Sequence, residues 1–172
     1  MLRTRRLDLV PLGPDDSDEM VDVLADERLY AFIGGKPPSL DELRDRYRRL
    51  AVGRSADGRE EWHNWIVRRR SDGRAVGTVQ ATIVEEGRAA EVAWVIGVPW
   101  QGQGLATEAA RALVRWLERR GIVTISAHVH PNHAASAGVA GRAGLTLTDE
   151  VDDGERVWSR SVVGPGRTES EH

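Results

Sequence analysis

The chain contains 172 residues and no cysteine, and its formal net charge is −3. Without cysteine it has no disulfide framework, no thiolate metal site and no cysteine nucleophile. The slightly acidic balance provides no general attraction to nucleic acid or to an anionic membrane. The start of the chain is too polar for a signal peptide, and no apolar run approaches the roughly 18 residues that a spanning helix needs. We therefore expect a soluble, cytoplasmic protein with one domain over residues 1–163 and a disordered tail over 164–172.

Arginine supplies nearly all of the positive charge, since Lys36 is the only lysine among 24 basic residues. Clusters such as Arg68–Arg70 would suggest nucleic-acid binding in a net basic domain with aromatic platforms. Acidic residues are interleaved with the arginines instead, as in residues 42–46. We therefore interpret the clusters as solvated helix faces and strand ends, and expect no nucleic-acid partner.

The hydrophobic pattern and the turn residues predict short elements through the first half of the chain. Ser39 and Glu42 form a capping box that starts a helix, and Ser71-Asp72-Gly73 is typical of a hairpin turn. In chain order we expect a strand over 7–12, a helix capped by Asp15 or Asp16 and ending near Leu24, a helical turn over 26–32, a helix over 39–50 with Leu40, Leu43, Tyr47 and Leu50 in one stripe, and strands over 62–68 and 74–84.

The second half of the sequence predicts alternating strands and helices, with no internal repeat. Pro99 follows an apolar strand over 91–98, and the next helix buries a stripe at helical spacing. The stripe consists of Leu105, Ala109, Ala112, Leu113, Trp116 and Leu117. Beyond it we expect a strand over 122–129, a short helix after Asn132, and strands over 146–151 and 157–162 joined by the acidic turn Asp152-Asp153-Gly154-Glu155.

Residues 101–106, Gln-Gly-Gln-Gly-Leu-Ala, form a side-chain-poor turn between the strand over 91–98 and the helix that follows. Such a turn exposes backbone N–H groups at the positive end of the helix dipole, where phosphates bind. Two common nucleotide motifs do not fit it. A Rossmann fingerprint requires a third glycine where Thr107 stands and a carboxylate on the next strand. A P-loop requires Gly-Lys, and Lys36 is the only lysine.

The turn does resemble another family. Gln101-Gly102-Gln103-Gly104-Leu105-Ala106 is similar to the Arg/Gln-x-x-Gly-x-Gly/Ala motif of the Gcn5-related N-acetyltransferases (GNAT), in surroundings like those of the RimJ/RimL-type branch. Residues 130–136, running to Gly144-Leu145, resemble the His-Pro-x-Asn-x-x-Ser segment of that branch. The resemblance implies an α/β GNAT fold. Its mixed, mostly antiparallel central sheet is flanked by helices and splayed between the fourth and fifth strands.

The resemblance also implies an activity. The protein would transfer the acetyl group of acetyl-CoA to a primary amine, either a protein N-terminus or a small amine. The amine would attack directly in a ternary complex, without a metal. The residues implied for acetyl-CoA are Val95, Ile96, Gly97, Val98, Gln101, Gly102, Gln103, Gly104, Leu105, Ala106, Thr107, Asn132 and Ser136.

Catalytic groups follow from the same resemblance. Glu91 matches an acidic residue that can take the proton of the amine, and Ser136 would lie near the sulfur. Glu91 can also be a charge on an edge-like strand, and Asn132 can be a simple N-cap. Many GNAT enzymes protonate the leaving thiolate with a tyrosine, and the matching position here is Val139. That difference leaves a non-catalytic acyl-CoA-binding or sensing domain open as an alternative.

The acceptor site in related enzymes lies between the first helices and the last hairpin. Here this implies Tyr30 and Phe32 on one side and Asp152 and Asp153 on the other, where the acids would attract a cationic amine. The acids can equally form a solvated hairpin tip. The resemblance is also compatible with a homodimer.

Three histidines lie close together in the sequence, at positions 128, 130 and 133. Two of them share a strand face, but no further ligand follows with convincing spacing. We therefore expect no metal site.

Overall fold

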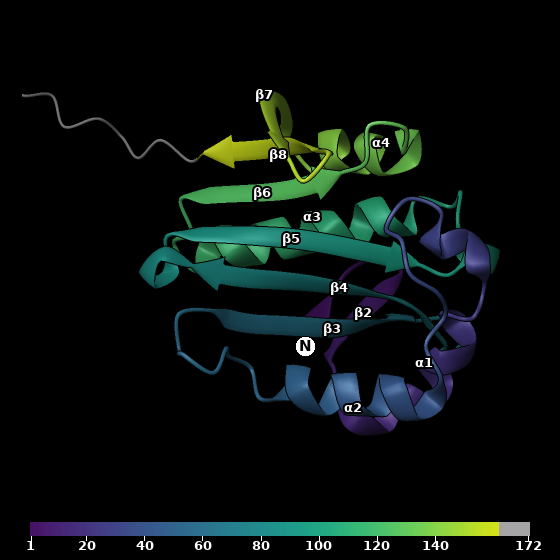
Figure 1. The fold of residues 1–172 in the computed structure, drawn as a ribbon. Helices are drawn as coiled ribbons and strands as arrows, with labels where there is room; N and C mark the ends of the chain where they lie inside the picture. The colour runs from purple at the N-terminus through teal and green to yellow at the C-terminus, as the bar shows by residue number, and fades with distance from the viewer. Residues whose placement is uncertain (162–172) are drawn as a thin grey trace, which may run out of the picture.

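The computed structural model describes residues 1–161, so the predicted tail over 164–172 lies outside the described residues. The strands form one eight-stranded sheet in the order β1-β2-β3-β4-β5-β6-β8-β7 (Figure 1). Neighbouring strands are antiparallel, except that β5 and β6 run parallel. The mixed, mostly antiparallel sheet with flanking helices confirms the predicted fold class.

The predicted strands and helices are present, with boundaries shifted by a few residues. The sequence did not predict β1, a two-residue strand that pairs with β2. The strands are β1 (Leu2–Arg3), β2 (Leu7–Pro11), β3 (Glu61–Arg69), β4 (Ala75–Val84), β5 (Ala89–Ile96), β6 (Thr124–Val129), β7 (Thr146–Asp152) and β8 (Glu155–Ser161). The helices are α1 (Ser17–Val23), α2 (Leu40–Ala51), α3 (Leu105–Arg119) and α4 (Ala134–Arg142), with 3-10 turns at Pro14–Asp16, Glu27–Tyr30, Glu85–Gly87 and Val98–Trp100. No helix in the described part of the chain is long and apolar enough to cross a bilayer.

Helices cover both faces of the sheet. On one face α1 and α2 pack through Met20, Leu43 and Tyr47 against Ile66 of β3. On the opposite face α3 buries the predicted stripe, with only Trp116 left partly exposed. The 3.6-residue spacing of these apolar side chains explains why α3 lies flat on the sheet.

Two local predictions at helix starts have different outcomes. The capping box of α2 is present, because Ser39 Oγ accepts the N–H of Glu42 and the Glu42 carboxylate accepts the N–H of Ser39. The expectation that Asp15 or Asp16 caps α1 is wrong. Asp16 occupies the N-cap position, but its carboxylate accepts the N–H of Gly13 at 2.8 Å and an Arg68 N–H at 3.2 Å.

The sheet opens between β5 and β6. Only Ala89–Glu91 pair with Thr124–Ser126, and the two strands then diverge toward their C-terminal ends (Figure 1). These are the strands over 91–98 and 122–129 between which the splay was predicted. The additional strand β1 makes them the fifth and sixth rather than the fourth and fifth.

Glu19 joins α1 to the sheet and gives a test of this packing. Its carboxylate accepts the N–H of Ala75 at 2.8 Å and an Arg68 N–H at 2.9 Å. We expect Glu19→Ala to lower the free energy of unfolding by about 1–2 kcal/mol, because it removes the acceptor of the Ala75 N–H and one of the two carboxylates that pair with Arg68. Asp18→Ala is the control, since the Asp18 side chain is 68% exposed and contacts only Arg44 in the described structure.

The effect of Glu19→Ala depends on pH. Burial acts to raise the pKa of Glu19, but the hydrogen bonds from Ala75 and Arg68 outweigh it and the pKa is lowered. A lowered pKa stabilises the folded protein above the ordinary carboxyl pKa, and this stabilisation is lost as the pH falls through the lowered value. Urea unfolding over a pH series should therefore show a difference between wild type and Glu19→Ala that shrinks in acid. An equal difference at every pH would contradict this assignment.

Candidate functional site

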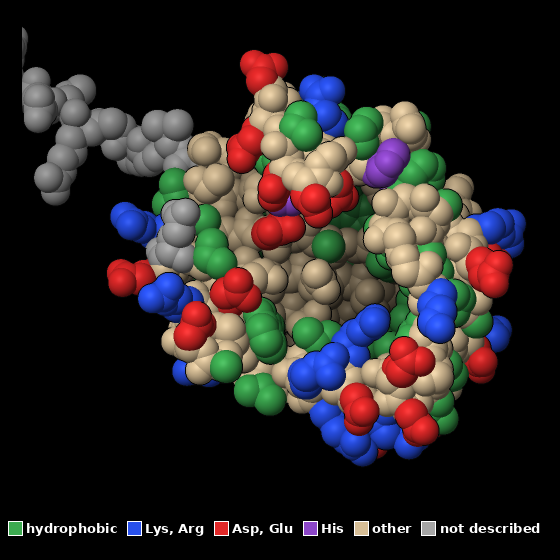
Figure 2. All heavy atoms as spheres, viewed as in Figure 1, with side chains coloured by type: hydrophobic (Ala, Val, Ile, Leu, Met, Phe, Trp, Pro, Cys, Tyr) green, Lys and Arg blue, Asp and Glu red, His purple; other side chains and the backbone are tan. Residues whose placement is uncertain are grey.

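The gap between β5 and β6 leads into a cavity of about 860 Å³. Figure 2 shows a hollow at the centre of this face, with acidic side chains along its upper rim and basic side chains along its lower rim. Its walls come from β4, β5 and β6, from the turn before α3, from α4 and from residues 28–33. A cavity of this size is within the range of small-molecule and cofactor sites.

The turn before α3 combines a left-handed backbone with an uncapped helix start. Gly102 and Gly104 have φ angles of 76° and 77°, a left-handed conformation that glycine adopts without strain. Gly104 is the N-cap of α3 and has no side chain with which to accept a helix N–H. The first N–H groups of α3 therefore remain available at the positive end of the helix dipole. The turn and the first residues of α3 line the cavity, so these groups can reach a bound phosphate.

Most of the residues that the sequence implicated line the cavity, and three do not. Those that line it are Val95, Ile96, Gln101, Gly102, Gly104, Leu105, Ala106, Thr107, Asn132 and Ser136, whereas Gly97, Val98 and Gln103 lie outside the lining. Gly97 has a packing role instead, because a Cβ there would lie 2.7 Å from the Trp100 ring. Gln101 uses its side-chain amide to donate to the carbonyl of Ile96 at 2.9 Å, so it connects the turn to the end of β5.

Beyond Glu91, the backbone edge of β5 faces the gap that opens where β6 diverges. The N–H of Gly97 donates to Val76 of β4, and the carbonyl of Val95 lies against Gly77 of β4. Because successive residues of an antiparallel pair alternate in direction, Trp94 and Ile96 direct their main-chain groups away from β4. The available N–H groups therefore belong to Trp94 and Ile96, one residue on either side of Val95.

The loop before α4 and the first turn of α4 contribute polar side chains to the cavity. Asn132 and Ser136 both line it. The N-cap of α4 is His133, without a side-chain cap, so the alternative that Asn132 is a simple N-cap is wrong. Val139 lines the cavity one turn further on, and its apolar side chain cannot donate a proton.

Glu91 and Asp152 meet at a histidine that lines the cavity. His128 Nδ1 lies 3.6 Å from Glu91 Oε1 and 3.5 Å from Asp152 Oδ2. Glu91 itself lies outside the lining, and its side chain is 53% exposed. The sequence suggested His128 only in connection with a metal. The approach of two carboxylates to its Nδ1 depends on strand register, which the sequence alone does not reveal.

The remaining predicted acceptor residues have different environments. Phe32 lines the cavity and stacks on His133 with ring centroids 4.4 Å apart. Tyr30 lies outside the lining and donates its hydroxyl to the carbonyl of Leu24 at 2.9 Å. Asp153 has a φ of 47° and forms the hairpin turn with Gly154, whose φ is 78°.

Two further features of the site concern the charge of His133 and the ability of the described residues to bind a metal ion. Burial, together with the neighbouring His130, lowers the pKa of His133, so this imidazole is neutral at neutral pH. Within residues 1–161, no group of three or more His, Asp or Glu side chains is arranged to hold a metal ion.

A family model for the acetyltransferase (GNAT) domain matches residues 6–146. The chain belongs to the GNAT acetyltransferase family. It is therefore an acetyltransferase, and the alternative of a non-catalytic acyl-CoA-binding domain is set aside. No curated protein matches the sequence closely.

Solved structures share the fold of this acetyltransferase at low sequence identity. A GNAT acetyltransferase from Bacillus anthracis has a TM-score of 0.76 at 15% identity, covering 93% of this chain and 97% of its own. RimL, a ribosomal L7/L12 α-N-protein acetyltransferase in complex with coenzyme A, has a TM-score of 0.76 at 17% identity, covering 92% and 96%. AAC(6′)-Ib, in complex with paromomycin and acetyl-CoA, has a TM-score of 0.76 at 17% identity, covering 91% and 93%.

Sequence reasoning missed two arginines of the acetyltransferase cavity, Arg28 and Arg142. Arg142, the last residue of α4, lines the cavity and donates to Thr107 Oγ1 at 3.5 Å. It makes no ion pair with any residue in the described part of the chain. Its guanidinium lies over Gly138, where a Cβ would come within 3.1 Å of Arg142 Nη2. Gly138 thus leaves room for the Arg142 guanidinium beside the turn of residues 101–106. No local sequence motif predicts this contact.

Substitutions at two glycines of the acetyltransferase separate the free-energy cost of a steric clash from that of a left-handed backbone conformation. A Cβ at Gly97 would lie 2.7 Å from the Trp100 ring and 3.1 Å from Val23, whereas a Cβ at Gly102 would meet nothing within 4 Å. We expect Gly97→Ala to destabilise the protein by about 2–3 kcal/mol through overpacking. Gly102→Ala should cost about 1–2 kcal/mol, through its left-handed backbone alone. Thermal unfolding measures both, and a Gly97→Ala protein as stable as wild type would contradict the packing described for Trp100.

Proposed function

We propose that this enzyme binds acetyl-CoA in the cavity and transfers its acetyl group to a primary amine, by direct attack in a ternary complex. The observation that carries the proposal is the anion-binding turn of residues 101–107 beside the unpaired edge of β5 in one cavity. The motifs of residues 101–106 and 130–136 support assignment to the RimJ/RimL-type branch. The cytoplasmic location, the homodimer and the single domain over 1–163 stay predictions.

The phosphates of acetyl-CoA would bind at the turn. The N–H groups from Gly102 to Thr107 would donate to the pyrophosphate, as phosphates commonly bind at helix N-termini. Arg142 would add a positive charge at the same place, because its guanidinium already contacts Thr107. Arginine suits this role, since its planar group can donate two parallel hydrogen bonds to a phosphate.

The pantetheine arm would run along the open edge of β5. Its amides would pair with the main-chain groups of Trp94 and Ile96, which β6 does not reach beyond residue 91. The same N–H groups are the candidates for polarising the acetyl carbonyl as negative charge develops on its oxygen. Asn132 would hydrogen-bond the arm from the side of α4.

The amine must lose a proton to attack the thioester carbon. We assign proton acceptance to His128, with Glu91 and Asp152 stabilising the imidazolium that forms. Glu91 would then act on the amine through His128 rather than directly. A peptide α-amine has a pKa near 7.7–8.0 and is already partly neutral at neutral pH, so the assistance needed is modest.

The carbon–sulfur bond breaks as the amide forms. Ser136 lines the cavity near the start of α4 and would hydrogen-bond the departing sulfur. Because Val139 stands where many relatives carry a tyrosine, no tyrosine hydroxyl assists from that position. A thiolate whose thiol has a pKa of about 8.5 is a tolerable leaving group without full protonation.

The acceptor would enter between Phe32 and the β7–β8 hairpin. Asp152 faces His128 from this hairpin, and the rim is acidic on that side. These charges favour a cationic acceptor, such as a protein N-terminus or a small amine. RimL, the L7/L12 acetyltransferase, and AAC(6′)-Ib, solved with paromomycin, illustrate both acceptor classes among proteins of this fold.

Calorimetric titration with acetyl-CoA tests the cofactor assignment. We expect saturable binding of acetyl-CoA, and no binding of NADH or ATP at the same concentrations. Gly104→Glu should abolish binding, because it adds a side chain and a negative charge at the turn. Arg142→Gln should weaken binding about tenfold, the usual scale for a lost charged hydrogen bond. Arg49→Gln, on the distant helix α2, is the charge-matched control. Failure of acetyl-CoA to bind wild type would refute the proposed function.

The assignment of His128 is tested by thiol release with a panel of primary amines. We expect His128→Gln to lower kcat about 10²-fold, the lower end of the range for a general base, with a smaller change in KM. His63→Gln is the matched control, since His63 lies outside the cavity lining. Unchanged kcat in His128→Gln would instead return the role to Glu91 or to solvent.

A further inference from the structure

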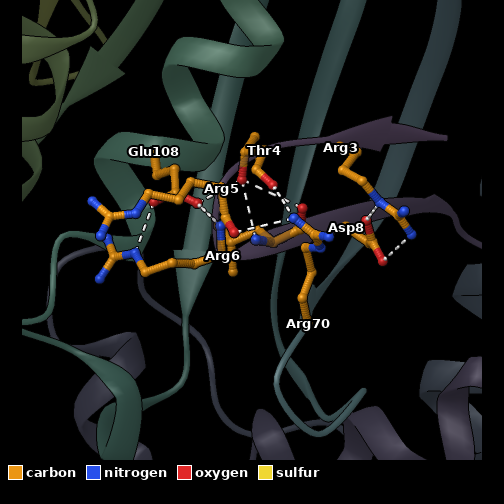
Figure 3. Close-up of polar contacts among 8 residues, drawn as sticks. Arg3, Thr4, Arg5, Arg6, Asp8, Arg70 and Glu108 are labelled. Carbon is orange, nitrogen blue, oxygen red and sulfur yellow. Dashed lines mark hydrogen bonds and ion pairs between the residues drawn. The ribbon is translucent and has the colours of Figure 1, made fainter.

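The N-terminal segment Thr4–Arg6 lies directly against the anion-binding turn and the first turn of α3. Figure 3 shows side chains of this segment converging on Glu108, which projects from α3. About a hundred residues of sequence separate the two segments. The contact is therefore a product of the tertiary fold, made where β2 begins beside α3.

Three donors from the segment saturate the carboxylate of Glu108. Arg6 Nε donates to Oε1 at 2.8 Å, and the backbone N–H of Arg6 donates to Oε2 at 2.9 Å. The hydroxyl of Thr4 donates to Oε2 at 2.5 Å. Burial acts to raise the pKa of Glu108, but these hydrogen bonds outweigh it and the pKa is lowered. Glu108 is thus a fixed anion with its charge balanced by Arg6.

Arg6 also holds the turn itself. Its Nη1 donates to the carbonyl oxygen of Gln103 at 2.9 Å. In a planar trans peptide the C=O and the following N–H point in opposite directions. Holding the Gln103 carbonyl outward therefore directs the N–H of Gly104 the other way. Gly104 lines the cavity and Gln103 does not, in agreement with that orientation.

The balance of charge at Glu108 matters because of its position. It lies in the first turn of α3, the helix end that would receive a phosphate. An acid here stabilises the helix through the dipole, but a carboxylate without a partner would repel a bound pyrophosphate. The ion pair with Arg6 preserves the stabilisation of the helix by Glu108. It removes most of the repulsion that the carboxylate would exert on a bound pyrophosphate.

The segment is anchored on its other side by β3 and the hairpin that follows. Arg70 Nη1 donates to the carbonyl oxygens of Thr4 at 3.0 Å and Arg5 at 3.2 Å. The backbone N–H of Arg70 donates to the carbonyl of Arg6 at 2.8 Å. Arg6 therefore reaches the turn from a backbone that is held in place.

We propose that Arg6, together with Thr4 and Glu108, is a positioning element that orients the Gln103–Gly104 peptide and neutralises Glu108, so that the turn accepts the pyrophosphate of acetyl-CoA. The inference rests on the proposed function for its ligand. The orientation of the Gly104 N–H is a property of the free protein. The orienting role of Arg6 can therefore be tested separately from the proposed function.

The principal test compares Arg6→Gln with Arg3→Gln by calorimetric titration with acetyl-CoA. Arg3 immediately precedes the segment and pairs with Asp8 at 2.7 Å, away from the turn. We expect Arg6→Gln to weaken binding about tenfold or more, since hydrogen bonds to charged groups are the strong ones. Arg3→Gln should stay within about twofold of wild type. Equal affinities for the two variants would overturn the proposal.

A double variant separates positioning from general stability. In Arg6→Gln the Glu108 carboxylate is left without its cation, so Arg6→Gln/Glu108→Gln should bind acetyl-CoA more tightly than Arg6→Gln alone, recovering about threefold of the loss. A purely structural role predicts the opposite, because two substitutions disturb folding more than one. Thermal unfolding of every variant checks that the proteins are folded.

The free protein provides the second readout. In nitrogen–proton correlation spectra without ligand, the Gly104 amide resonance should shift strongly in Arg6→Gln and remain in place in Arg3→Gln. If acetyl-CoA fails to bind wild type while Gly104 responds in this way, the proposed function fails and the orienting role of Arg6 stands. An unmoved Gly104 resonance in Arg6→Gln would refute the orienting role whatever the binding result.

Discussion

The divergence of β5 and β6 is the constraint on which the rest of the site depends. The two strands pair over only three residues, Ala89–Glu91 with Thr124–Ser126. Beyond them the N–H groups of Trp94 and Ile96 and the carbonyl of Trp94 have no strand to pair with on that side, whereas the carbonyl of Ile96 accepts from the Gln101 side chain. Buried N–H and C=O groups are normally satisfied, since leaving them unpaired costs free energy. A ligand with amides of its own, as pantetheine has, would supply the missing partners.

Two features border the divergence and shape the cavity. The Gln101 side chain donates to the Ile96 carbonyl at 2.9 Å and fixes how β5 passes into the turn. At the far side, α4 begins beside the end of β6 and contributes Asn132 and Ser136 to the cavity. The gap is thus bordered by a strand edge, a helix N-terminus and a polar helix start. The strand edge is suited to amides and the helix N-terminus to phosphates. The polar helix start is suited to the reacting end of an acyl-CoA.

Electrostatics distinguish the two ends of the cavity. The end near the turn is positive, through the α3 dipole and through Arg142 beside Thr107. Its one nearby acid, Glu108, is balanced by Arg6. The end near the β7–β8 hairpin is acidic, with Asp152 and Glu91 both near Nδ1 of His128. This separation of charge suits a polyanionic donor at one end and a cationic acceptor at the other.

Sequence alone determined most of the elements and the glycine-rich turn before α3, because both are encoded locally, whereas it did not predict β1. The apolar stripe of α3 has a period that only a helix can satisfy, and Gly102 and Gly104 are required where the backbone has positive φ. Only the tertiary structure determined the side-chain contacts that local sequence patterns do not encode. Register brings Glu91 and Asp152 to Nδ1 of His128, the contact between β2 and α3 brings Arg6 to Gln103, and the α3–α4 packing brings Arg142 to Thr107. Each of these relations joins residues far apart in the chain, and such pairings are set by the packing of the whole sheet rather than by any short pattern.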